Sequence, residues 1–195
     1  MTEAVPTIPA HVGRVLPALA RAAIADEIGA PVPPAVGGVV DARMEELLQA
    51  PGAVFVTLHT DGELRGCVGS LEPQRPLGTD VDANARASAV QDRRFRPLSA
   101  EDLPRTAIEV SVLSPTRQQH ATSEGDAAAL LRPGVDGVVL RWRDRRGTFL
   151  PSVWEVIPEP REFVERLRLK AGIPEDVWPE VVFETYTVSR FEEES

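Results

Sequence analysis

The sequence predicts an α+β fold with a mainly antiparallel β-sheet and flanking helices. Three observations support this class: two β-hairpin signals, helical stretches between the strand-like runs, and no regular strand-helix-strand alternation of the kind that builds a parallel sheet. With 195 residues, 43% of them hydrophobic, the chain can bury roughly 70% of its unfolded surface without a disulfide or metal. We therefore expect one domain, with room for a minor lobe.

The first half of the chain predicts a helix, a hairpin and a second helix. Residues 11–28 have apolar side chains at helical spacing, and this helix either kinks at Pro17 or begins near it. The β-branched run at 53–60 is typical of a buried strand, and Asp61-Gly62 predicts a tight turn into a second strand that contains Cys67. The alanine-rich residues 76–92 predict the next helix.

The second half of the chain also predicts strands that alternate with helices. Residues 107–113 alternate apolar and polar side chains, which indicates a half-buried strand. The elements expected after it are a helix at 124–131 capped by Thr122 or Ser123, a hairpin with strands at 138–142 and 147–150, a helix at 158–172 ending at Gly172, and a last strand at 181–188. A single domain at 11–191 is thus predicted, with an N-terminal extension at 1–10 and an acidic tail at 192–195.

The charge balance argues against two classes of partner. Thirty acidic residues outnumber 21 basic ones, and the net charge of -9 would repel a phosphate backbone, so we expect no nucleic-acid binding. The basic run at 141–146 is interpreted as a solvated hairpin tip. No stretch approaches the roughly 20 apolar residues of a membrane span, and residues 1–10 lack signal-peptide character. We expect a cytoplasmic protein that does not bind a membrane.

Cys67 is the only cysteine, and it lies between Gly66 and Gly69. The two glycines allow another backbone or a ligand to approach closely. A single thiol excludes an internal disulfide, a redox cysteine pair and a multi-cysteine zinc cluster. His11 and His120 show no ligand spacing, so neither a metal site nor a cofactor is predicted.

The hairpin register decides which side chains lie near this thiol. A regular two-residue turn pairs Val56 with Cys67 and puts His59 on the opposite face from Arg65 and Cys67. A one-residue bulge instead places all three side chains on one face. A guanidinium at Arg65 would favour a thiolate, whereas a strand cysteine between apolar neighbours can equally be a small buried hydrophobe.

Three further polar residues have two interpretations each. Asn84 and Asp92 fall on the apolar stripe of the helix at 76–92, where they serve either as structural ties or as lining of a pocket, with the tie favoured for Asp92. Glu109 lies on the polar face of its strand, either solvated or directed into a cleft. Trp154 is either core or part of a site.

Five segments in order resemble the AMMECR domain family, whose bacterial and archaeal members are called AmmeMemoRadiSam system protein A. The segments are LRGCVGSLEP at 64–73, NARASAVQDRRFRPLS at 84–99, IEVSVLSP at 108–115, LRPGVDG at 131–137 and GTFLPSVWE at 147–155. The resemblance covers residues 11–191 and implies a larger and a smaller subdomain with a cleft between them. The family's RGC motif, which maps to Leu64, Arg65, Gly66, Cys67 and Gly69, is expected near that cleft. Ser152 stands where the family usually has glutamine.

The resemblance implies no established reaction, so the family's biochemical activity is uncharacterised. Its system name implies association with a Memo-like protein and a radical SAM enzyme. We therefore expect a cleft enzyme or small-molecule-processing subunit in which Cys67 and Arg65 are catalytic, with Arg65 holding an anionic group. The cleft residues in this hypothesis are Gly66, Gly69, Asn84, Glu109 and His59. The alternative is a non-catalytic adaptor that binds its partner proteins through its surface.

Overall fold

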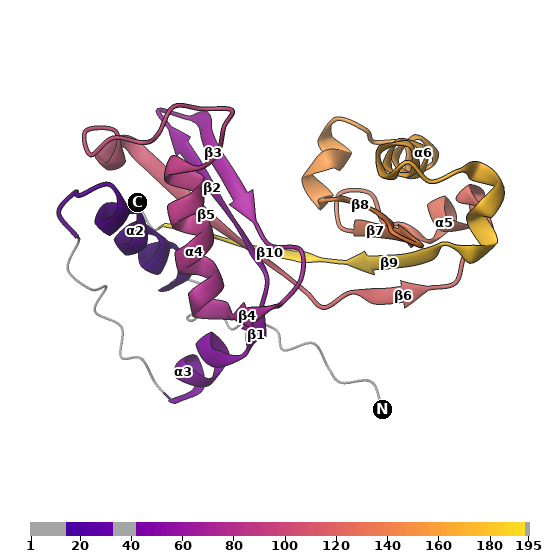
Figure 1. Cartoon of the computed structure of the whole chain (residues 1–195), viewed down its shortest axis with the longest axis horizontal. Helices are drawn as coiled ribbons and strands as arrows, with labels where there is room; N and C mark the ends of the chain where they lie inside the picture. The colour runs from indigo at the N-terminus through magenta and orange to yellow at the C-terminus, as the bar shows by residue number, and fades with distance from the viewer. Residues whose placement is uncertain (1–14, 33–41, 194–195) are drawn as a thin grey trace. The chain divides into compact units, whose positions relative to one another are not determined.

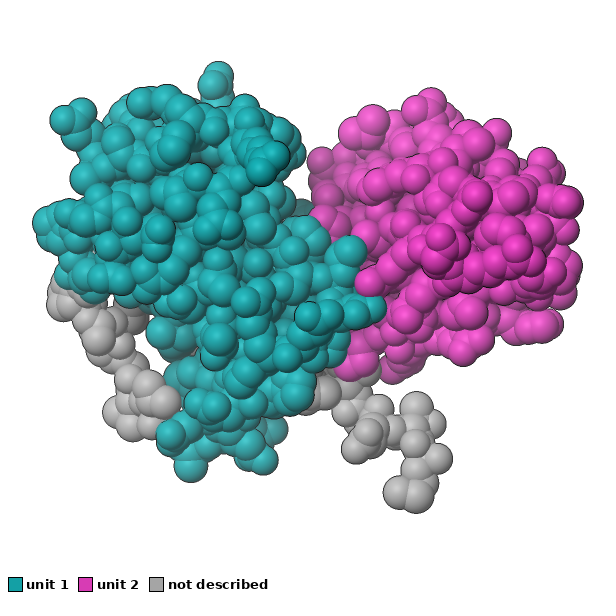
Figure 2. All heavy atoms as spheres, in the orientation of Figure 1, with its two compact units in different colours: residues 1–113, 189–195 teal, residues 114–188 magenta. Residues whose placement is uncertain are grey.

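The computed structural model describes residues 15–32 and 42–193, and the chain divides into two compact units, which Figure 2 shows in separate colours. The larger unit 1 comprises Met1–Leu113 and Ser189–Ser195, and the smaller unit 2 comprises Ser114–Val188. Unit 2 is thus inserted into the sequence of unit 1. The paired strands are antiparallel and mixed with helices, which confirms the predicted α+β class. The predicted extension at 1–10 lies outside the described residues.

Unit 1 is built on a four-stranded sheet in the order β10-β5-β2-β3. Its helices are α2 (Val15–Glu27), α3 (Ala42–Gln49) and α4 (Leu77–Val90), its strands are β1 (Pro51–Gly52), β2 (Val54–Thr60), β3 (Glu63–Gly69), β4 (Arg75–Pro76), β5 (Thr106–Leu113) and β10 (Val188–Glu192), and η1 (Leu103–Arg105) is a short 3-10 helix. Strands β1 and β4 form a separate two-stranded pair (Figure 1).

The core of unit 1 lies between this sheet and its helices. Alternate residues of β2, namely Val54, Val56 and Leu58, are fully buried, as the two-residue period of a strand requires for one face against a core. Apolar residues of α2 and α4 pack against them, including Ile24 and Val81. The intervening residues of β2 are only half-buried. One face of the sheet therefore belongs to the core, and the other presents polar side chains.

The C-terminal strand of unit 1 extends into the predicted acidic tail. Strand β10 runs to Glu192, and Arg21 of α2 pairs with Glu193 and also donates to the carbonyl oxygen of Leu103 at 3.0 Å. The first residue of the predicted tail is thus in a strand at the edge of the sheet. Residues 194–195 lie outside the described residues.

Unit 2 contains a second antiparallel sheet, in the order β6-β9-β7-β8. Its elements are the strands β6 (Arg117–Gln119), β7 (Gly137–Trp142), β8 (Arg145–Phe149) and β9 (Val182–Tyr186), the helices α5 (Glu124–Leu130) and α6 (Pro160–Ala171), and the 3-10 helices η2 (Pro151–Glu155) and η3 (Glu175–Glu180). Ser123 caps α5 by accepting from the amide of Asp126 at 3.1 Å. Gly172 ends α6 with a φ of 68°, as predicted.

Two sequence interpretations are settled in unit 2. Trp154 is a core residue: its ring stacks on Phe163 with centroids 3.8 Å apart, and its indole N–H donates to the carbonyl oxygen of Asp136 at 2.7 Å. The basic residues at 143–146 are exposed at the turn between β7 and β8, which fits the predicted hairpin tip.

Candidate functional site

The hairpin that contains Cys67 has the predicted tight turn. Asp61 and Gly62 both adopt positive φ, 54° and 85°, which is the geometry that Asp-Gly favours in two-residue hairpin turns. Thr60 pairs with Glu63 on either side of this turn. The sequence signal at 61–62 therefore predicts the local backbone correctly.

The register then shifts by one residue at Arg65. His59 pairs with Leu64, but its neighbour Leu58 pairs with Gly66, so Arg65 is the extra residue of a β-bulge. Of the two registers left open by the sequence, the bulged one is present. Beyond the bulge, Cys67 pairs with Thr57, and His59 therefore lies on the same face of the hairpin as Cys67.

A row of polar side chains crosses the sheet at this level. Thr57 pairs with Cys67 on one side and with Glu109 of β5 on the other. The Thr57 hydroxyl donates to the sulfur of Cys67 at 3.5 Å, and Glu109 accepts from the Ser111 hydroxyl at 2.8 Å. Cys67, Thr57, Glu109 and His59 are all half-buried. The structure thus brings three predicted site residues, Cys67, Glu109 and His59, onto one face.

Both glycines beside Cys67 are in contact with the protein's own groups. A Cβ on Gly66 would lie 2.2 Å from the carbonyl oxygen of Ser88 in α4, so only glycine allows this close approach of strand and helix. A Cβ on Gly69 would lie 2.3 Å from the ring of Phe55. The close approaches expected at Gly66 and Gly69 therefore exist, and a helix backbone and an aromatic ring make them.

Asn84 is on the other face of the sheet, in the seam between β2, β3 and α4. Its side-chain amide donates to the carbonyl oxygen of Val54 at 3.2 Å and to the Ser70 hydroxyl at 3.1 Å, and the residue is 5% exposed. Ser88 follows Asn84 by four residues on the same face of α4, and its hydroxyl donates to the carbonyl oxygen of Val56 at 2.8 Å. These contacts make Asn84 a structural tie, and the structure does not bring it together with Cys67.

Asp80 completes the seam and was not singled out from the sequence. It is 1% exposed and accepts from the amide of Val54 at 2.8 Å, the amide of the Asn84 side chain at 3.0 Å, the Ser70 hydroxyl at 2.8 Å and the Arg75 guanidinium at 2.7 Å. A buried carboxylate is stable only with such partners. The available signal was its spacing of four residues from Asn84, which places both on one helix face.

Asp92 connects the outer edge of β3 to the end of helix α4. This is the structural tie that the sequence analysis favoured for it. Its carboxylate accepts from the amide of Cys67 at 2.9 Å and from the Arg94 guanidinium at 2.7 Å. The hydrogen bond from Arg94 is the main reason why the pKa of Asp92 lies far below its usual value, and the amide of Cys67 lowers it further. Asp92 therefore remains a carboxylate at neutral pH.

Arg94 is the guanidinium that the structure brings to Cys67. It donates to the carbonyl oxygen of Cys67 at 3.3 Å. Asp92 contributes most to raising the pKa of Arg94, and the thiol of Cys67 contributes as well. Sequence analysis missed this residue because its position depends on the path of the chain after α4. The only signal was the density of arginines at 93–96.

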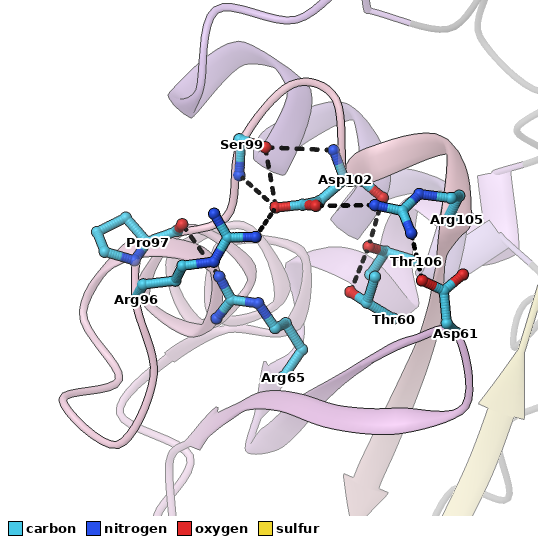
Figure 3. Close-up of polar contacts among 9 residues, drawn as sticks. All are labelled: Thr60, Asp61, Arg65, Arg96, Pro97, Ser99, Asp102, Arg105 and Thr106. Carbon is cyan, nitrogen blue, oxygen red and sulfur yellow. Dashed lines mark hydrogen bonds and ion pairs between the residues drawn. The ribbon is translucent and has the colours of Figure 1, made fainter.

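Arg65 lies two residues before Cys67, but its guanidinium contacts a different group. It donates to the carbonyl oxygen of Pro97 at 3.1 Å, next to Arg96 (Figure 3). The bulge explains this path, because the extra residue has no partner across the hairpin. The expected neighbour of Cys67 is thus replaced by Arg94, while Arg65 extends to the loop that follows α4.

Within 15–32 and 42–193, no group of three or more histidine, cysteine, aspartate or glutamate residues has the arrangement of a metal site. Over the same residues, none of the helices combines the length and the apolar composition needed to cross a bilayer.

The fold and this face define a two-unit α+β domain with one half-exposed cysteine on an antiparallel sheet. A profile of the AMMECR1 family matches residues 17–191, and the chain belongs to this family. It is 39% identical over 150 residues to a protein of Thermotoga maritima, covering 75% of this chain and 81% of that protein. Protein MJ0810 of Methanocaldococcus jannaschii is 34% identical over 154 residues, covering 75% of this chain and 73% of that one.

A solved structure has the same fold. The crystal structure of the uncharacterized protein PH0010 from Pyrococcus horikoshii superposes with a TM-score of 0.78 at 30% sequence identity, covering 96% of this chain and 94% of that one. The family assignment made from the five sequence segments is therefore confirmed.

Proposed function

We propose that this protein binds and processes a small molecule at the polar face of the unit 1 sheet, with Cys67 as its reactive group. The observation that carries the proposal is the 3.5 Å hydrogen bond from the Thr57 hydroxyl to a half-exposed sulfur. The Thr57 hydroxyl orients this sulfur, and the Arg94 guanidinium lies close by, where it donates to the carbonyl oxygen of Cys67 at 3.3 Å. A thiolate can act as a nucleophile, and a thiol as an acid.

Two other side chains on this face can support that chemistry. Glu109 is directly across β2 from Cys67, and His59 is two residues along β2 from Thr57. A carboxylate and an imidazole are the usual general acids and bases of active sites. In this proposal they orient a substrate or move its protons, and Arg65 holds an anionic part of it.

The reactivity of Cys67 is the test. We expect iodoacetamide to label the native protein at a rate within about tenfold of a urea-denatured control, because a half-exposed thiol needs no unfolding to react. A Cys67→Ser variant measures the background, since no other cysteine exists. Protection of the native thiol by a factor close to the unfolding equilibrium constant would refute the proposed nucleophile.

The second candidate function is that of a non-catalytic adaptor, and one observation favours it. The spaces beside Gly66 and Gly69 are filled by Ser88 and Phe55, so packing alone explains both glycines of the motif. The partners in this proposal are a Memo-like protein and a radical SAM enzyme. Co-purification of either partner with the Cys67→Ser variant as efficiently as with the wild type, combined with a protected native thiol, would favour the adaptor.

Two further parts of the proposal are the extent of the functional domain and its location in the cell. We propose that residues 11–191 form the functional domain and that it works in the cytoplasm. A variant that begins at residue 11 should retain the labelling rate of Cys67. Cell fractionation that recovers the protein with membranes would argue against the location.

A further inference from the structure

A positively charged patch lies beside the Cys67 strand in a chain whose net charge is -9. Its members are Arg65 on the bulge and Arg93, Arg94 and Arg96 in the loop after α4. Within residues 15–32 and 42–193, Arg94 pairs with Asp92 and Arg96 pairs with Asp102, whereas Arg65 and Arg93 form no ion pair. The loop has more positive than negative charge, so an anion would be attracted to it.

Arg65 is held in place with most of its donors still available. The residue is half-buried, and the one hydrogen bond that its side chain makes with the described residues is the 3.1 Å bond to the carbonyl oxygen of Pro97. A guanidinium presents several N–H donors in a rigid planar fork, and one of them is used here. The side chain is thus oriented in advance, while an edge of its fork has no protein partner.

The guanidinium of Arg96 is oriented by an ion pair with Asp102. Its side chain is 72% exposed, and it donates to Asp102 at 3.1 Å. Asp102 is itself fixed by the Ser99 hydroxyl at 2.9 Å and also accepts from Arg105 at 3.1 Å. A carboxylate held in this way keeps Arg96 near Pro97, although most of the guanidinium faces solvent.

In Figure 3 the side chains of Arg65 and Arg96 extend toward each other, and the Arg65 guanidinium donates to the carbonyl oxygen of Pro97, the residue that follows Arg96. In this region three guanidiniums lie near two carboxylates: Arg96 and Arg105 both pair with Asp102, Arg105 also pairs with Asp61, and Arg65 pairs with neither. Arg105 contacts both carboxylates, so the unbalanced positive charge lies with Arg65 and Arg96. Two adjacent cations repel each other, and a shared anion would relieve that repulsion.

We propose that Arg65 and Arg96 form a binding subsite for the phosphoryl group of the small molecule processed by this protein. A phosphate monoester carries nearly two charges and three acceptor oxygens, which match two guanidinium forks, whereas a carboxylate is satisfied by one. The same loop reaches Cys67 through Arg94. The inference rests on the proposed function in one respect: it takes the bound phosphoryl compound to be the substrate. Binding of a phosphoryl group requires no reactive thiol.

The probe is inorganic phosphate, titrated into the full chain at low ionic strength and followed by the line width of its phosphorus NMR signal. We expect saturable binding that Arg65→Gln and Arg96→Gln each weaken about tenfold, because each substitution removes charge-assisted hydrogen bonds to the anion. Arg93→Gln is the matched control: it removes the same charge from the same loop and should change the affinity less than about threefold. Arg65→Lys keeps the charge without the fork and should fall between Arg65→Gln and wild type.

Three results would overturn the subsite. They are no saturation in the wild type, equal losses in Arg65→Gln, Arg96→Gln and Arg93→Gln, and displacement of phosphate by acetate at equal concentration. Because Arg96 is largely exposed, Arg96→Gln carries the test even if circular dichroism shows that Arg65→Gln fails to fold. Cys67→Ser should bind phosphate as the wild type does. A protected thiol would thus refute the proposed function alone, and absent phosphate binding with a reactive thiol would refute the subsite alone.

Discussion

Gly66 lies directly against the backbone of Ser88: a Cβ at position 66 would come within 2.2 Å of the Ser88 carbonyl oxygen. Strand β3 and helix α4 therefore approach each other too closely at this point to leave room for a side chain at position 66. The contact lies one residue from Cys67, so the position of the thiol depends on it.

We expect Gly66→Ala to lower the free energy of unfolding by about 1 to 3 kcal/mol, because a methyl group would force the strand from the helix backbone. Urea unfolding measures the change. Gly125→Ala in α5 is the control, since the nearest atom to its Cβ is 3.7 Å away, and it should be neutral or slightly stabilising. Equal stability of Gly66→Ala and wild type would contradict the close packing.

Ser88→Ala should cost about 1 to 3 kcal/mol of unfolding free energy, because it removes the hydroxyl that donates to the Val56 carbonyl oxygen and accepts from the Val68 amide. The exposed Ser152→Ala should change it by less than about 0.5 kcal/mol. Both variants are compared by urea unfolding under the same conditions. Similar values for the two would mean that the seam adds little to stability.

The pH dependence of stability should contain a contribution from Asp92. Its pKa is lower in the folded protein than in the unfolded chain, so the unfolded chain binds the proton more readily as the pH falls. The stabilisation is complete above about pH 5 and is lost as the pH falls through about 4 and below. Asp92→Asn should be less stable than wild type at pH 7, and this difference should shrink towards pH 3. Urea midpoints across this range provide the measurement, and a constant difference would count against the ion pair.

Arg94→Gln should slow the native labelling of Cys67 by iodoacetamide about two- to fivefold at pH 7.5, because it removes the positive charge that contacts the Cys67 backbone and interacts electrostatically with its side chain. Arg93→Gln, which removes the adjacent exposed charge, should leave the rate nearly unchanged. Stopped-time labelling followed by mass spectrometry of the intact chain gives both rates. If the two variants slow labelling equally, the effect comes from general charge and not from the Arg94 contact.

Two buried tryptophans of unit 2 form a matched pair. Trp154 donates to the carbonyl oxygen of Asp136, whereas the indole N–H of Trp178 has no hydrogen-bond partner among the described residues. We expect Trp154→Phe to cost about 1 to 2 kcal/mol more than Trp178→Phe, because only the first leaves a buried acceptor unpaired. Chemical unfolding monitored by circular dichroism compares them. A larger loss for Trp178→Phe would show that ring packing outweighs the hydrogen bond.

The sequence predicted those features that depend on local chemistry. The Asp61-Gly62 turn, the strand at 107–113 and the end of α6 at Gly172 all follow from the conformations that these residues favour. The strand β6 was missed because it is short and polar. The helix α3 was missed as well, and only Met44 of its residues is buried, so its apolar pattern is weak.

The site was predicted less completely than the fold, for a physical reason. Cys67, His59 and Glu109 share a face only because Arg65 is bulged, and a bulge depends on the balance of tertiary contacts such as Gly66 against Ser88. Arg94 reaches Cys67 through a loop whose path no short pattern specifies. Register and loop path are long-range properties, so a local reading could state the alternatives but not choose between them.

The insertion of unit 2 between β5 and β10 has a consequence for how the chain folds. Strand β10 pairs beside β5 only after the whole of Ser114–Val188 has been synthesised, and the ends of that segment must then meet. Early compaction of unit 2 would shorten the effective loop and reduce the entropy that closing it costs. We therefore expect the sheet of unit 1 to be completed late, with an uncovered β5 edge prone to association in nascent chains.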